Sequence, residues 1–75
     1  MMKWHWNKFS KRWELERPDG FYLIYSYSYE EFEVCFAPKV DGKCVGISST
    51  LGRFAKCKKA KERVIDIIFE KELSK

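Results

Sequence analysis

Apolar and polar residues alternate along the first part of the chain in a pattern typical of β-strands. Residues 13–16 alternate between apolar and acidic side chains, and residues 21–27 are rich in aromatic and β-branched types. Such residues favour strands, in which successive side chains point to opposite faces. The sequence Pro-Asp-Gly at residues 18–20 is a strong turn signal, because proline presets φ and glycine accepts positive φ. We therefore predict a β-hairpin over residues 13–27.

A second pair of strand-like runs follows. Residues 32–37 alternate strictly between large apolar residues and Glu, Cys or Ala, and Pro38 ends this run. Asp41 and Gly42 are the next turn signal, and residues 45–50 follow it as another β-like run. These features predict a second hairpin.

The hydrophobic period changes from two to about 3.6 in the last third of the chain. From residue 56 to residue 73, one side of a helix would gather Cys57, Ala60, Val64, Ile67, Ile68 and Lys71, with mostly charged residues opposite. The fold class that we expect is α+β. One domain over residues 1–75 would hold an antiparallel sheet of three or four strands packed against one C-terminal α-helix.

The run over residues 21–27 does not say by itself which of its side chains face the helix. We expect Phe21 and Leu23 to pack under the helix, and we leave Tyr27 and Tyr29 open between packing and exposure. Exposed tyrosines would be suited to binding another protein, because Tyr and Trp are enriched among the residues that dominate protein interfaces.

Residues 1–12 allow two interpretations. Trp6, Phe9 and Trp13 have a spacing that permits a short helix, and four basic residues make the stretch a basic aromatic arm. Such an arm could stack on nucleic-acid bases through Trp4 and Trp6. Alternatively, these aromatic residues cover the otherwise open side of the small sheet.

Composition limits the class of protein. A chain of 75 residues supports one core, and its thirteen aromatic residues are enough to fill it. No apolar run approaches the length of about 18 residues that a membrane span needs. The N-terminal residues lack the apolar stretch of a secretory signal. We expect a cytoplasmic protein.

The reactive residues do not assemble into a catalytic or metal-binding pattern. The three cysteines, Cys35, Cys44 and Cys57, are odd in number and widely spaced, and His5 is the only histidine. Neither a disulfide scaffold nor a zinc site has this spacing. No set of residues divides the roles of nucleophile, base and oxyanion donor. We expect no enzyme activity, no metal, no cofactor and no small-molecule substrate.

Charge is unevenly distributed along the chain. Residues 43–63 hold seven cations and one carboxylate, whereas the whole chain has a net charge of +4. The cations near the start of the predicted helix are Arg53, Lys56, Lys58, Lys59, Lys61 and Arg63. Cations are disfavoured there by the helix dipole, and a helix start rich in Lys and Arg suits phosphates or carboxylates. A solvated Lys-rich surface is the alternative interpretation.

The second half of the chain resembles the double-stranded-RNA-binding domain. The resemblance lies in the alternation of residues 32–36, in Asp41-Gly42, in Gly46 and Gly52, and in the Lys-x-Ala-Lys sequence of residues 58–61. In that family a lysine cluster opens the last helix and contacts phosphates across a groove. The resemblance implies contacts from Lys58 and Lys61, with Lys56 and Lys59 nearby.

The same region also resembles the three-stranded-sheet-plus-helix domain of integrase N-termini and of plant ethylene-response factors. The matching residues are Leu-Gly-Arg-Phe at 51–54 and Ala60 on the helix. In those proteins the sheet lies in the DNA major groove. Both resemblances cover roughly residues 20–73 and imply a nucleic-acid-binding function.

Two functions therefore stand as hypotheses. The first is a small nucleic-acid-binding module that holds DNA or RNA phosphates with the basic residues around the helix start. The second is an inhibitor, of the anti-CRISPR or other anti-defence type that phages and mobile elements encode, which binds a host protein or ribonucleoprotein through Trp4, Trp6, Tyr27 and Tyr29. Exposed aromatic residues beside Glu30, Glu31 and Glu33 on the sheet face away from the helix would favour a protein partner.

Overall fold

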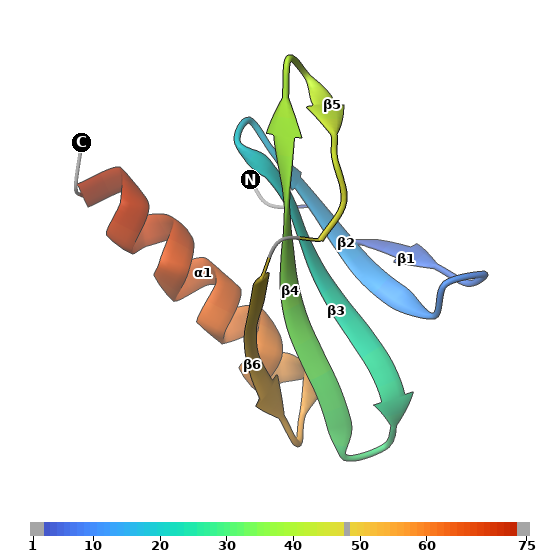
Figure 1. The fold of residues 1–75 in the computed structure, drawn as a ribbon. Coiled ribbons are helices and arrows are strands. Elements are labelled where there is room, and N and C mark those ends of the chain that lie inside the picture. Colours follow the sequence, from blue (N-terminus) through green and yellow to red (C-terminus); the bar gives the residue numbers. More distant parts are fainter. Residues whose placement is uncertain (1–2, 48, 74–75) are drawn as a thin grey trace.

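The computed structural model describes residues 3–47 and 49–73, which form one antiparallel sheet of six strands and one helix (Figure 1). In chain order the elements are β1 (His5–Asn7), β2 (Arg12–Arg17), β3 (Gly20–Ser28), β4 (Glu31–Val40), β5 (Lys43–Cys44), β6 (Ser49–Phe54) and α1 (Cys57–Leu73). The predicted α+β class, the antiparallel sheet and the C-terminal helix are confirmed. The sheet has more strands than the three or four predicted.

β3 and β4 are the central strands of the sheet. The strand order is β1-β2-β3-β4, after which β6 pairs with the first half of β4 and β5 pairs with its last two residues. Both predicted turns join neighbouring strands, since residues 18–20 connect β2 to β3 and residues 41–42 connect β4 to β5. Asp41 and Gly42 have φ values of 52° and 78°, which a tight two-residue hairpin turn requires.

The strand predicted over residues 45–50 begins later than expected. Residues 45–47 lie outside the strands, Ser48 lies outside the described residues, and β6 starts at Ser49. Gly46 has a φ of 105°, which glycine tolerates but a regular strand does not contain. The chain therefore leaves the short β5 and returns to pair with the opposite half of β4.

A strand takes the place of the short helix considered for residues 1–12. β1 pairs with β2, and Trp6 lies opposite Trp13 with ring centroids 5.2 Å apart. Packing of two aromatic rings across strands contributes about 0.5–1.5 kcal/mol beyond their burial. A helix would lose this cross-strand contact, which explains why the helical spacing of Trp6, Phe9 and Trp13 is misleading.

The core lies between α1 and one face of the sheet. Its buried side chains are Leu15, Tyr22, Ile24, Val34, Ala60, Val64 and Ile68. The helix contributes every fourth residue of its apolar side, as its sequence period predicts. Lys71, predicted for the same side, is exposed with its ammonium nitrogen 4.4 Å from the centroid of the Phe36 ring.

The prediction that Phe21 and Leu23 pack under the helix is wrong. Tyr22 and Ile24 face α1, whereas Phe21 and Leu23 lie on the opposite side of the sheet, which we call the open face. The cause is the pairing of β3 with β4, because Tyr22 lies opposite Phe36 and Ile24 lies opposite Val34. β3 is apolar at both odd and even positions, so its own alternation does not identify the buried side.

Gly20 allows β3 and β4 to approach closely. A Cβ atom at this position would lie 2.4 Å from the carbonyl oxygen of Ala37, and its φ is 156°. At Gly42, by contrast, a Cβ atom would meet nothing within 4 Å, although its φ of 78° is also unfavourable for other residues.

We expect Gly20→Ala to destabilise the fold by more than the roughly 1–3 kcal/mol of backbone strain alone, because the backbone of β4 must also shift. Gly42→Ala is the matched control and should cost only the strain. Urea unfolding of both variants measures the two losses of unfolding free energy. Equal losses would contradict the close approach at Gly20.

Candidate functional site

A row of four paired residues crosses the open face of the sheet. The strand register places Arg12 on β2 opposite Tyr25 on β3, Tyr25 opposite Glu33 on β4, and Glu33 opposite Arg53 on β6. Directly opposed residues on one face of a sheet are close enough for their side chains to interact. The row therefore alternates positive, aromatic, negative and positive groups across the sheet.

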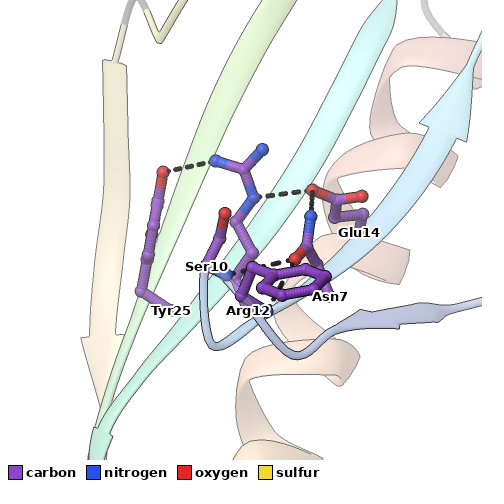
Figure 2. Close-up of polar contacts among 6 residues, drawn as sticks. Asn7, Ser10, Arg12, Glu14 and Tyr25 are labelled. Carbon is purple, nitrogen blue, oxygen red and sulfur yellow. Dashed lines mark hydrogen bonds and ion pairs between the residues drawn. The ribbon is translucent and has the colours of Figure 1, made fainter.

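Hydrogen bonds hold the first half of this row in place (Figure 2). Arg12 donates from Nη1 to the Tyr25 hydroxyl at 2.7 Å and from Nε to Glu14 at 2.6 Å. Burial would lower the pKa of Arg12, but the hydrogen bonds to Glu14 and Tyr25 outweigh it and the pKa is raised. The guanidinium therefore stays charged and fixed beside the Tyr25 ring.

The turn between β1 and β2 is tied to the same network (Figure 2). Asn7 donates its side-chain amide to Glu14 at 3.4 Å, and its Oδ1 accepts the backbone N–H groups of Phe9 and Ser10 at 3.0 and 3.1 Å. An asparagine that caps its own turn in this way restricts the turn to one shape. The turn carries Phe9, whose side chain is 89% exposed.

The second half of the row is held by Glu33. Its carboxylate accepts a hydrogen bond from the Tyr27 hydroxyl at 2.9 Å and one from Arg53 Nε at 3.2 Å. Arg53 also pairs with Glu31 at 3.5 Å. Tyr27 stacks on Tyr25 with centroids 6.2 Å apart and rings 11° from parallel.

Exposed aromatic side chains lie at the end of β3 and on the two turns that flank this end of the sheet. The backbone N–H of Ser26 donates to the carbonyl of Lys11, which places the β1–β2 turn beside the end of β3. Phe9, Tyr27 and Tyr29 are 89%, 56% and 97% exposed. Together with Tyr25 we call these residues the aromatic end. Tyr25 and Tyr27 share one face as their spacing predicts, whereas Tyr29 lies in the turn after β3.

The six basic residues predicted as one site do not form one surface. Arg53 lies on the open face in ion pairs with Glu31 and Glu33, away from α1. The other five lie at or near the start of α1: Lys56, Lys58, Lys59, Lys61 and Arg63. Two of these are within ion-pair distance of helix carboxylates, Lys59 of Glu62 at 3.5 Å and Arg63 of Glu70 at 4.0 Å.

Trp4 and Trp6 lie on the helix side of the sheet and not with the tyrosines. Trp4 and Trp13 pack against the core, and Trp6 stacks on Trp13. The interpretation that the N-terminal aromatic residues cover the open side of the sheet is therefore wrong, because Trp4 packs at the margin of the core beside α1. Phe9 does not share this role.

Two other classes of site are absent from residues 3–47 and 49–73. No group of three or more His, Cys, Asp or Glu residues there is placed to hold a metal ion. In the same residues no helix has the length and apolar character that crossing a bilayer would require. The three cysteines are free thiols, and burial raises the pKa of Cys35, which makes this thiol a poor nucleophile.

The sequence pointed to Tyr27, Tyr29 and the acidic group of Glu33 but missed the contributions of Arg12 and Asn7. Arg12 and Tyr25 are opposite one another once the turn at residues 18–20 is recognised, so hairpin register was a usable signal for this pair. The meeting of Glu33 with Arg53 depends on the pairing of β4 with β6, which no local pattern indicates.

The network makes a prediction about the titration of Tyr27. Its pKa is raised, first by the hydrogen bond that its hydroxyl donates to Glu33 and then by desolvation, while Arg53 acts in the opposite direction. Glu33→Ala should lower this pKa towards the ordinary tyrosine value. NMR titration of tyrosine Cζ resonances measures it, with Glu16→Ala as a control that leaves Tyr27 untouched. An unchanged Tyr27 pKa in Glu33→Ala would show that the hydrogen bond does not form in solution.

Comparisons with known proteins indicate no function for this chain, so a function has to be inferred from the fold and from these surfaces. No protein-family model, curated protein or solved structure matches this chain.

Proposed function

We propose that this protein is a non-enzymatic module that binds another protein through the aromatic end and the adjoining row of the open face. The observation that carries the proposal is the exposure of Tyr27, which is stacked on Tyr25 and hydrogen-bonded to Glu33, with Tyr29 exposed in the turn after β3 and Phe9 exposed in the hydrogen-bonded β1–β2 turn. Exposed apolar groups that lie together on a surface, as Tyr27 does with Tyr25, mark sites of interaction with other proteins. An inhibitor that blocks a host protein is the form of this function that we propose.

Preorganisation supports this use of the surface. Binding loses affinity when side chains must be immobilised, at about 0.5–1.5 kcal/mol for each flexible side chain. Tyr25 and Tyr27 are already held by Arg12 and Glu33, so less of this entropy remains to be lost. Tyrosine and arginine are also the residue types that most often dominate interface energies.

The charge of the open face favours a protein over a nucleic acid. Its carboxylates are Glu14, Glu16, Glu31 and Glu33, and each of them pairs with Arg12, Lys39 or Arg53. A face whose cations are already neutralised offers little attraction for phosphates. Glu30, in the turn beside Tyr29, adds a further acidic group, so a protein groove with basic flanks is the complementary partner surface.

Site-specific photo-crosslinking tests this proposal in cells that contain the partner. With a benzophenone amino acid in place of Tyr27, we expect one predominant protein adduct that survives nuclease treatment. The same group in place of Asp66, which is exposed on α1, is the matched control and should not give that adduct. Once the partner is purified, Phe9→Ala and Tyr27→Ala should each weaken binding about tenfold or more.

Two results would overturn the proposal. One is equal adduct formation from positions 27 and 66, which would mean that contact is nonspecific. The other is an adduct that nuclease removes, which would mean that the aromatic end contacts nucleic acid.

A further inference from the structure

A second surface, on the helix side of the sheet, combines tryptophan rings with lysines. The Lys61 ammonium lies 4.1 Å from the centroid of the Trp13 ring and 5.7 Å from that of Trp4, and Trp6 is tilted against Trp13. These contacts join β1 and β2 to the second turn of α1. We call Trp4, Trp6, Trp13, Lys58 and Lys61 the tryptophan–lysine surface.

The charge of this surface is positive and largely uncompensated. Lys58 lies three residues before Lys61 and so on a neighbouring position of the same helix side. Glu62, the closest carboxylate along the helix, is paired with Lys59. Among the described residues neither Lys58 nor Lys61 is within ion-pair distance of a carboxylate, and the first turn of α1 holds no acidic residue.

The aromatic part of the surface is partly accessible. Trp6 is 38% exposed, although Trp4 and Trp13 are half-buried against the core. Trp6 therefore presents ring area to solvent, and it packs on Trp13, the ring that the Lys61 ammonium contacts. Aromatic rings next to a basic track are the means by which proteins hold single-stranded nucleic acid, with bases on the rings and phosphates on the cations.

We propose that the tryptophan–lysine surface binds single-stranded nucleic acid, with a base stacked on Trp6 and adjacent phosphates paired with Lys58 and Lys61. Duplex DNA or RNA fits less well, because its bases are already stacked within the helix and are not free to stack on Trp6. An acidic protein segment would satisfy the lysines but would not use the exposed tryptophan ring. Tyr25 of the aromatic end lies on the other side of the sheet from Trp4 and Trp13, whereas Phe9 lines the same hollow as Trp6.

This site would neutralise fewer phosphates than the six basic residues that the sequence predicts as one site. With two phosphates neutralised, the logarithm of the binding constant should fall with the logarithm of salt concentration at a slope of about −1.4. If Lys56 also contributes, the slope becomes about −2.1. A grip by all six cations would give about −4.

The test measures binding of the full-length protein to fluorescein-labelled oligothymidylate and oligouridylate across a salt series, with duplex DNA, duplex RNA and polyglutamate as parallel probes. We expect tighter binding to the single strands, with quenching of tryptophan fluorescence. Trp6→Ala should weaken single-strand binding about fivefold or more, since stacking of one base contributes about 1–3 kcal/mol.

Charge variants separate the lysines from the rest of the molecule. Lys58→Gln with Lys61→Gln should abolish most of the binding, whereas Lys61→Arg should retain it. Lys59→Gln is the matched control, because Lys59 is paired with Glu62. Thermal unfolding of each variant confirms that the fold is intact, which matters because Lys61 packs on Trp13.

Tighter binding to either duplex, equal binding to polyglutamate, or an unchanged affinity in a folded Trp6→Ala variant would overturn the single-strand site. Tyr27→Ala should leave oligothymidylate binding unchanged, since Tyr27 lies on the open face. The two proposals can therefore fail independently.

Discussion

The antiparallel pairing of β3 with β4 determines how the rest of this protein is arranged. These are the longest strands, and their register places Tyr22 opposite Phe36 and Ile24 opposite Val34, all directed towards α1. Side chains alternate between faces with a period of two, so a slip of one residue would exchange the buried and open sets. The core, the position of the helix and the composition of the open face all follow from this register.

Apolar side chains are buried in different ways on the two faces of the sheet. One face is covered by α1, with Val64 and Ala60 fully buried against it. The open face has no second layer from the described helix, yet Leu23 and Ala37 on it are buried. Neighbouring side chains, including Phe21 and Tyr25, pack against these buried apolar residues. An organised open face is thus a structural necessity as well as a surface available for binding.

The basic residues differ in whether a carboxylate neutralises their charge. Arg53 is only three residues from Lys56 along the chain but lies on the open face, where Glu31 and Glu33 neutralise it. Lys61 is instead held over Trp13, which offers the attraction of an aromatic ring without removing the charge. The charge of Lys61 therefore remains available beside the tryptophans, whereas Arg53 is paired with carboxylates on the open face.

The sequence alone determined the elements whose signals are local. The turn residues at 18–20 and 41–42, the alternation in β2 and β4, and the helical period from Cys57 to Leu73 all report contacts between residues close in the chain. It also singled out Tyr27, Tyr29 and the lysines of α1 as candidate binding residues, although it left open whether the two tyrosines are packed or exposed. Only the tertiary structure decided which side of β3 is buried, that Trp6 belongs to a strand, and that Arg53 is separated from the lysines. These outcomes depend on the pairing of strands distant in sequence, and a run that is apolar at both odd and even positions contains no information about which partner it will meet.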